Sequence, residues 1–299
     1  MHHKYLGDDN MPVVDMYNFS LFLEYIEERY KAHIRKDNHT YPVTTNLAIK
    51  RLKFININRK HDTQTKNVIK YIVNNKDLSL EDKILNIIIF RGWGIWETMR
   101  LFGAPFTKEN LPQKLEDAKM KYERIVRATP RHKFYTSAPY VAVLKIADYK
   151  APSPVLNALY LAKKALEKRI PQRILQAHDE QEVIELLKTL PGLAPFISYQ
   201  MFLDMTYIPE FPFSEENYVF ASTRVRFALR SIFKYSDGLS YEECVVWLRD
   251  NLPKLAPDFM ERMQEIMTDV PEDERSLTLT MVQSALYGFA DYLKFVRRK

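Results

Sequence analysis

The sequence predicts an all-α protein. Apolar residues recur every three or four positions along most of the chain, whereas the period-two alternation typical of strands is scarce. Ser, Thr and Asp caps, together with Pro and Gly stops, divide the chain into pieces of helical length. The most distinctive of these pieces is a helical hairpin centred on Pro191-Gly192.

Residues 179–204 are expected to form two helices joined by a tight turn. Asp179 can cap the first helix, and Gly192 can end it because glycine adopts a positive φ without strain. Pro195 suits the first turn of the second helix. Helix-hairpin-helix DNA-binding elements have this pattern, and their free backbone N–H groups suit a DNA phosphate. An ordinary helical hairpin explains the same pattern equally well.

Composition narrows the class of protein. A chain of 299 residues with 46% hydrophobic and 27% charged residues is expected to be globular. We expect a single helical domain over 1–299, or two intimate lobes at 1–150 and 151–299, with the hairpin in the second. The net charge of +6 favours a polyanionic partner.

Several classes of site are disfavoured. The single cysteine, Cys244, leaves no internal disulfide or thiolate metal cluster and fits a reducing, intracellular compartment. The sequence has no apolar run of membrane-spanning length, and the N-terminus lacks the apolar core of a signal peptide, so no membrane partner is expected. Neither GxxxxGK nor GxGxxG occurs. The seven histidines are scattered, so no metal site is predicted.

The N-terminal segments alternate between helices and polar loops. Residues 16–36 form an amphipathic helix, and 37–45 form a loop. Residues 46–62 are rich in cations and amides, which suits contact with phosphates and base edges, although a solvated basic face has the same composition. Residues 63–73 are again helical.

The segment that begins at Ser79 is expected to be the central core helix, because it is apolar almost all round. It ends in two glycines and two tryptophans between Arg91 and Glu97, which indicates a shaped pocket. Aromatic packing with Arg91 paired to Glu97 is the structural alternative.

The middle of the chain contains further helices. Residues 111–127 form a charged helix, and 129–149 form a basic, aromatic loop in which 140–146 is a short strand or a helix start. Residues 153–169 are helical and capped by Ser153. After the hairpin, 210–213 is a loop and Ser214 caps a turn.

Four further helices are expected in the C-terminal third of the chain. Arg224, Arg226 and Arg230 begin a helix at 222–230 and form an anion-facing set or a solvated face. A capping box with Glu243 begins a helix at 240–251. A short helix at 257–267 and a polar break at 272–275 precede the final helix, 276–297.

Three carboxylates are candidates for chemistry: Asp62, Glu97 and Asp204. Asp204 lies in mid-helix in a mostly apolar sequence, where it is either a base that activates an amine or water, or a buried Asp paired to an arginine. The combination of a helical hairpin and a nearby acidic residue resembles that of base-excision DNA glycosylases. However, Pro195-Phe196 stands where lyase-type enzymes have a lysine, and only glutamates at 210–216 follow in the region of the glycosylase aspartate.

A second resemblance covers nearly the whole chain. The sequence is similar to the α-glutamyl/putrescinyl-thymine pyrophosphorylase group, whose relatives include the helical domain attached to 5-hydroxymethyl-deoxyuridine DNA kinases. The matching pieces occur in order: Phe54-Ile55-Asn56-Ile57-Asn58-Arg59 with Asp62; Phe90-Arg91 with Trp96-Glu97-Thr98; Leu190-Pro191-Gly192 with Phe196, Tyr199-Gln200, Asp204 and Tyr207; and Val282-Gln283 with Leu286, Phe289 and Tyr292.

The resemblance implies a helix-hairpin-helix, DNA glycosylase-like helical fold and a role in phage thymine hypermodification. The implied reaction replaces pyrophosphate on 5-(pyrophosphoryloxymethyl)uracil in double-stranded DNA with the amine of an amino acid or polyamine. A 5-hydroxymethyluracil DNA kinase is the implied partner, and the host cytoplasm the implied location if the gene is a phage gene. Mg²⁺ could assist the pyrophosphate but is not required.

The implied roles fall on residues of these motifs and of the Arg224 helix. Asp204 or Glu97 would accept the amine proton, and arginines would clamp the pyrophosphate. Trp96 and Tyr199 would stack on an extruded base, and the turn at Gly192 would hold the DNA backbone. The full set of clamp and contact residues is Arg59, Arg91, Arg224, Arg226, Asn58, Asp62, Gln200 and Gln283.

The chain departs from the pattern of the group at three places. Gly92-Trp93-Gly94 stands where an asparagine is usual, Ala221–Arg224 replaces a glycine-rich turn, and Tyr287-Gly288 stands where Cys-Glu is usual. Two alternative functions therefore stay open. One is a DNA glycosylase that uses Asp204 or an acid from 210–216, and the other is a non-catalytic DNA-binding partner of the kinase.

Overall fold

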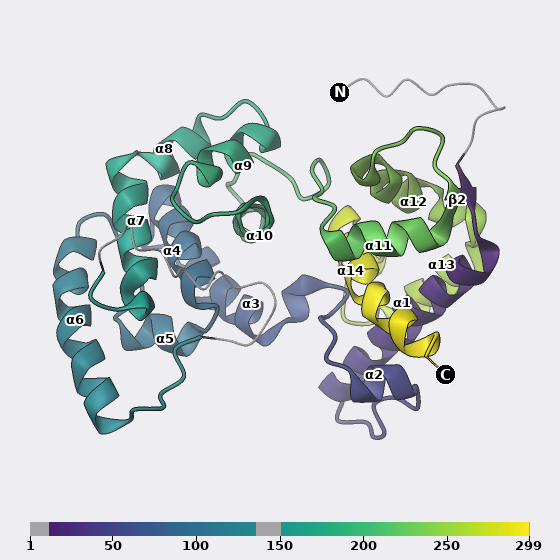
Figure 1. Ribbon diagram of the computed structural model, residues 1–299, viewed down its shortest axis with the longest axis horizontal. Coiled ribbons are helices and arrows are strands. Elements are labelled where there is room, and N and C mark those ends of the chain that lie inside the picture. The colour runs from purple at the N-terminus through teal and green to yellow at the C-terminus, as the bar shows by residue number, and fades with distance from the viewer. Residues whose placement is uncertain (1–11, 136–150, 299) are drawn as a thin grey trace. The chain divides into compact units, whose positions relative to one another are not determined.

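The computed structural model describes residues 12–135 and 151–298 (Figure 1). Helices form most of this part of the chain, which confirms the all-α prediction. Its one small sheet pairs β1 (Val13–Val14) antiparallel with β2 (Phe233–Tyr235). The predicted strand or helix start at 140–146 lies outside the described residues, and 129–135 forms the start of the predicted loop.

The chain groups into two compact units. Unit 1 comprises Met1–Asp62 and Val219–Lys299, and unit 2 comprises Thr63–Tyr218. Unit 1 is therefore discontinuous in sequence, and its bounds are not those of the lobes expected at 1–150 and 151–299. The organisation as one domain or two lobes stays a prediction.

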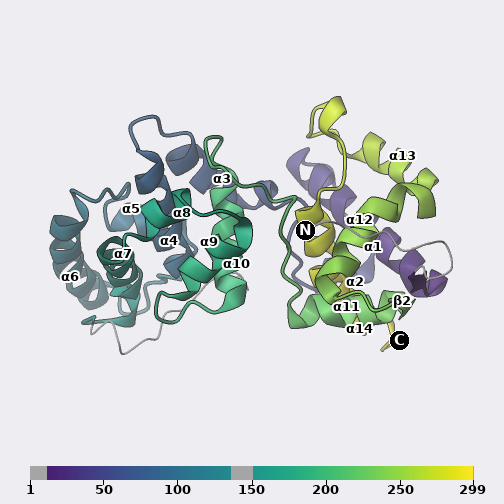
Figure 2. The same ribbon diagram turned by 90° about the horizontal axis from the view of Figure 1, so that it is seen from above.

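Unit 1 is built around its last helix, α14, whose residues are buried almost all round. Helices α1, α11 and α12 pack against α14 (Figure 2). α14 begins after Thr278, whose side chain accepts a hydrogen bond from Met281 N, and not at Ser276 as the sequence predicted. The elements of unit 1 besides the sheet are α1 (Met16–Asp37), α2 (Leu47–Arg51), η1 (Arg59–His61), α11 (Thr223–Ile232), α12 (Tyr241–Leu255), α13 (Pro257–Ile266), η5 (Glu272–Glu274) and α14 (Leu279–Val296).

Unit 2 is built around α4, and the prediction of a central core helix there is confirmed. Every residue of α4 from Asp82 to Trp93 is buried, and α5, α7, α8 and α10 pack against it. The sequence did not predict α5 and α8. The elements of unit 2 are α3 (Thr63–Val68), the π-helix η2 (Ile69–Val73), α4 (Leu80–Trp93), α5 (Trp96–Leu101), α6 (Leu111–Ala128), η4 (Pro154–Leu156), α7 (Asn157–Glu167), α8 (Ile170–Leu175), α9 (Glu180–Lys188) and α10 (Pro195–Met205).

The hairpin at 179–204 has the predicted local form. The Asp179 side chain caps α9 by accepting a hydrogen bond from Glu182 N at 2.8 Å. Gly192 has φ +79°, and Pro195 begins α10. The turn therefore needs glycine at this position because other residues reach this φ only with strain.

Candidate functional site

Arg91 and Asp204 form a buried ion pair between α4 and α10. Arg91 is 3% and Asp204 1% exposed. The guanidinium donates from Nε to Oδ2 and from Nη2 to Oδ1 of the carboxylate, at 2.5 Å each. The expected alternative of an Arg91–Glu97 pair is therefore wrong, whereas the structural alternative for Asp204, a buried Asp paired to an arginine, is confirmed. Both oxygens of the Asp204 carboxylate already accept hydrogen bonds from Arg91. The evident role of the ion pair is therefore structural, because it joins the core helices α4 and α10. The role of Asp204 as a base stays a prediction.

Two further predicted site residues are buried beside Asp204 in α10. Tyr199 is 0% and Gln200 1% exposed. The Tyr199 ring lies 5.9 Å from the Tyr218 ring, measured between centroids. A side chain so enclosed can stack on an extruded base only if neighbouring groups move first.

An accessible group lies at the start of α5. The side chain of Gln64 accepts a hydrogen bond from Trp96 N at 2.7 Å and donates to Glu97 Oε2 at 3.3 Å. Tyr71 stacks on Trp96 with ring centroids 4.7 Å apart and planes 7° apart. Glu97 is exposed and Tyr71 is 40% exposed, whereas Trp96 is only 9% exposed. We call Gln64, Tyr71, Trp96 and Glu97 the Trp96 group.

Sequence reasoning missed Gln64 and Tyr71. Tyr71 lies in the π-helix η2, whose wider turn differs from the α-helix that the periodicity predicts. Lys70 adds a cation 5.0 Å from the centroid of the Tyr71 ring. The only local signal in the sequence was the adjacent pair Lys70-Tyr71, within a segment predicted to be helical.

The hairpin turn presents an exposed backbone at Gly192 and Ala194. The Leu193 N–H is used within the turn, where it donates to Leu190 O at 3.2 Å. Lys168 donates to Thr189 O at 2.7 Å and so places an ammonium group beside the end of α9. This arrangement of an exposed turn with an adjacent cation suits a phosphate.

The predicted residues around η1 belong to unit 1 and are engaged locally. The Asn58 side chain caps η1 by accepting a hydrogen bond from Lys60 N at 3.0 Å, and Arg59 is 3% exposed. Asp62 accepts a hydrogen bond from Asn56 Nδ2 at 2.8 Å. Burial raises the pKa of Asp62 above its ordinary value, against the opposing charge of Arg59.

Arg224 and Arg226 of α11 are exposed, but their guanidinium groups already have partners within unit 1. Arg224 pairs with Asp291 at 2.8 Å and lies over the Tyr287 ring. Arg226 donates to Ala221 O at 2.7 Å and lies over the Tyr241 ring. In α14, the buried Gln283 side chain donates to Phe220 O at 3.5 Å.

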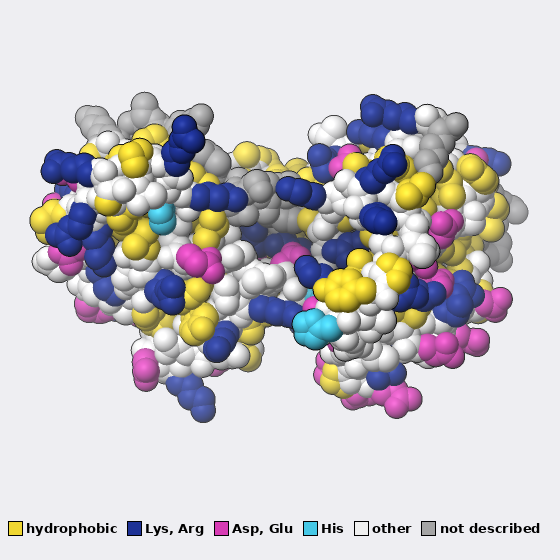
Figure 3. Space-filling model, turned by 90° about the horizontal axis from the view of Figure 1, so that it is seen from below, with side chains coloured by type: hydrophobic (Ala, Val, Ile, Leu, Met, Phe, Trp, Pro, Cys, Tyr) yellow, Lys and Arg dark blue, Asp and Glu magenta, His cyan; other side chains and the backbone are white. Residues whose placement is uncertain are grey.

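The predicted site residues are therefore divided between the two units. Unit 2 contains Arg91, Trp96, Glu97, Gly192, Tyr199, Gln200 and Asp204, and unit 1 contains Asn58, Arg59, Asp62, Arg224, Arg226 and Gln283. On the face drawn in Figure 3, Lys and Arg side chains are interspersed with Asp and Glu.

Comparison with protein families matches residues 16–298 to the helical domain of 5-hmdU DNA kinase. The chain belongs to this helical-domain family. The match covers the motifs at 54–62, 90–98, 190–207 and 282–292, so the resemblance to the kinase-associated helical domain is confirmed. Membership in the pyrophosphorylase group stays a prediction. Neither a search of curated proteins nor a search of solved structures gave a match.

Two further features of the described residues concern a membrane and a metal ion as binding partners. Among the described residues, no helix combines the length and apolar character needed to cross a bilayer. The same residues contain one group of three or more potential metal ligands, His33, His61 and Asp269. The sequence pattern gave no sign of this group because its members are far apart along the chain.

Proposed function

We propose that this chain is a DNA-modifying transferase that acts on 5-(pyrophosphoryloxymethyl)uracil in double-stranded DNA. The family match over residues 16–298 carries the proposal, because the family is named as the helical domain of 5-hmdU DNA kinase. A phosphorylated hydroxymethyl group is an activated leaving group, so a later displacement is the natural next reaction. The sequence has no glycine-rich nucleotide motif, and the kinase step is assigned to a partner.

The proposed step is a substitution at the 5-methylene carbon. The C–O bond breaks, pyrophosphate leaves with the electron pair, and the amine nitrogen of an amino acid or polyamine forms the new C–N bond. A base must take the proton that the attacking amine loses. Arginines, with Mg²⁺ as an optional aid, would meet the charge of the leaving group.

Glu97 is a better candidate for this base than Asp204. Its carboxylate is exposed and has one long hydrogen bond from Gln64, whereas both oxygens of Asp204 are held by Arg91. Trp96, which precedes Glu97, is buried, but the Tyr71 ring stacked on it is 40% exposed and offers an aromatic surface for an extruded base. The Trp96 group therefore supports the transferase better than the α10 residues do.

The expected result of the direct test is a new amine-adducted thymidine. Duplex DNA containing 5-hydroxymethyluracil would be incubated with this chain, a 5-hydroxymethyluracil DNA kinase, ATP and a pool of amino acids and polyamines. Digested nucleosides would then be analysed by mass spectrometry. Glu97→Gln should lower the rate by about 100-fold or more, the usual contribution of a general base.

Glu123→Gln is the matched control, because Glu123 is an exposed glutamate of α6 in the same unit. Its rate should equal that of the parent chain. Unchanged bases in every sample would contradict the transferase and, if the DNA is still bound, favour the non-catalytic partner. Abasic sites would favour the DNA glycosylase. The predicted helix-hairpin-helix, glycosylase-like fold is also compatible with that activity.

Gly192→Ala is expected to weaken DNA binding through the hairpin. An alanine at φ +79° destabilises the turn by about 1 kcal/mol and moves the backbone N–H groups proposed to hold a phosphate. Gly238→Ala in unit 1 is the control, because Gly238 has φ +76° and no atom within 4 Å of the added Cβ. Unfolding should show a similar loss for both variants. A DNA titration that gives equal affinities for the two variants would remove the hairpin from the DNA interface.

A further inference from the structure

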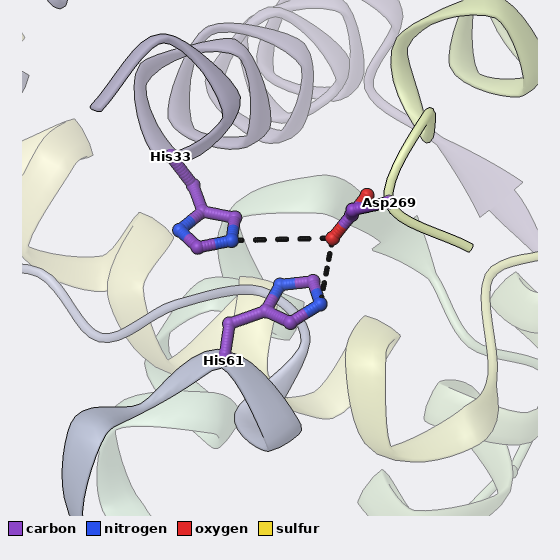
Figure 4. Close-up of side chains that lie close together, drawn as sticks. All are labelled: His33, His61 and Asp269. Carbon is purple, nitrogen blue, oxygen red and sulfur yellow. Dashed lines mark ion pairs between the residues drawn. The ribbon is translucent and has the colours of Figure 1, made fainter. Parts of the chain in front are cut away.

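Three segments of unit 1 bring two imidazoles and a carboxylate together. His33 comes from the last turns of α1, His61 from η1, and Asp269 from the turn after α13 (Figure 4). Nε2 of His61 lies 2.7 Å and Nε2 of His33 lies 3.9 Å from the same oxygen, Oδ2 of Asp269. The two rings stack, with centroids 4.3 Å and planes 13° apart, and both Nε2 atoms face the same oxygen of Asp269.

The distances between these atoms are close to those of a metal site. The three ligand atoms all lie within 4.8 Å of one another. In a tetrahedral Zn²⁺ site with bonds of about 2.0–2.1 Å, neighbouring ligand atoms lie roughly 3.3 Å apart. The two distances to Asp269 Oδ2, 2.7 and 3.9 Å, have this value as their mean. To make both distances suitable, the carboxylate oxygen would move by about 1 Å, away from His61 and toward His33.

The surroundings orient the carboxylate. Tyr30, a core residue of α1, donates its hydroxyl hydrogen to Oδ1 of Asp269 at 3.1 Å. Oδ2 is thereby left on the side of the two imidazoles. Metal-binding carboxylates and histidines usually have such outer hydrogen bonds, which fix the ligand before the ion arrives.

A fourth potential ligand, a second carboxylate, lies next to the group. Asp37 is one helical turn after His33, and its Oδ2 lies 3.5 Å from His33 Nε2. The side chains of Asp37 and Asp269 are 48% and 24% exposed, so an ion can reach the group from solvent. Two imidazoles favour Zn²⁺ and neighbouring transition metals over Mg²⁺ and Ca²⁺, which prefer oxygen ligands alone.

We propose that His33, His61 and Asp269 bind one divalent transition-metal ion, with Zn²⁺ as the best fit and Asp37 as the fourth ligand. Four protein ligands leave no open position, which is typical of a structural site. The ion joins the end of α1, the η1 segment and the turn after α13, three parts of unit 1 that are distant in sequence. Its function is to hold Asn58, Arg59 and Asp62, which flank or lie in η1, in a fixed arrangement.

The test is a titration of the chelator-treated full chain with ZnCl₂, followed by calorimetry and by thermal unfolding. We expect one Zn²⁺ per chain and a higher unfolding midpoint in its presence. Co²⁺ in place of Zn²⁺ should give the strong visible absorption of a four-coordinate site. His61→Ala and Asp269→Asn should each weaken Zn²⁺ binding by at least 100-fold and abolish the Co²⁺ signal.

His178→Ala is the control, because His178 is an exposed histidine outside unit 1. It should bind Zn²⁺ as the parent chain does. If His61→Ala does not fold, Asp269→Asn decides, since it keeps the size of the side chain. No binding by the parent chain, or equal binding by the parent and both ligand variants, would leave only a hydrogen-bonded His–Asp pair and overturn the proposal. Undiminished binding by Asp37→Asn would overturn the assignment of the fourth ligand.

Discussion

Asp204→Ala is expected to lower the free energy of unfolding by about 3–5 kcal/mol. The substitution removes the carboxylate that pairs with Arg91 and leaves a guanidinium that is 3% exposed between α4 and α10. A buried charge that loses its main partner costs far more than a surface ion pair contributes. Denaturant unfolding followed by circular dichroism measures this loss, and Arg91→Ala should lose a comparable amount.

A double replacement separates the charge from the packing. Arg91→Met combined with Asp204→Leu removes both charges and keeps much of the apolar volume, so most of the stability should return. Equal losses in the double and the single variants would show that the ion pair is not the cause of the lost stability.

The loss of stability also affects the test of function, because Asp204→Ala could be inactive simply because it unfolds. Asp204→Asn, assayed at a temperature where it is folded, is the better test of Asp204 as a base.

Gly288→Ala is expected to destabilise unit 1 by about 3 kcal/mol, at the upper end of the usual cost of overpacking. A Cβ at Gly288 would lie 2.0 Å from the hydroxyl oxygen and 2.9 Å from Cζ of Tyr25. Tyr25 is fully buried, and its ring contacts those of Phe54, Phe289 and Tyr292. Its ring therefore cannot move aside without disturbing three other rings. The unfolding midpoint in denaturant measures the effect.

Two companion variants make this prediction specific. Tyr25→Leu opens the space, so Gly288→Ala should cost much less in the Tyr25→Leu background than in the parent chain. Ser284→Ala, one turn earlier in α14, is the control and should change stability by little, because it removes an oxygen without adding volume. A cost of Gly288→Ala that does not depend on Tyr25 would contradict the steric explanation.

The contact between Gly288 and Tyr25 also explains one departure from the pyrophosphorylase pattern. That group usually has Cys-Glu where Tyr287-Gly288 stands here. In this chain a glutamate at 288 would meet the buried Tyr25 hydroxyl, so a glutamate there is sterically incompatible with Tyr25 in its present position. If the transferase proposal holds, its acid and base must come from elsewhere, and Glu97 is the accessible carboxylate of the predicted set.

The sequence by itself determined most of the local structure. The helix that begins after Ser240 has the predicted capping box, and the turn at Gly192 has the predicted positive φ. These features depend on residues within four positions of each other, so their signals are present in a short stretch of sequence. The motif order was also sufficient to indicate the helical-domain family.

Only the tertiary structure decided which side chains meet. It paired Arg91 with Asp204, 113 positions away, instead of with Glu97. It placed Tyr71 on Trp96 through a π-helical turn, and it joined His33 and His61 to Asp269. Such pairs depend on how whole helices pack, and a periodic apolar pattern specifies which face is buried but not which polar partner lies opposite.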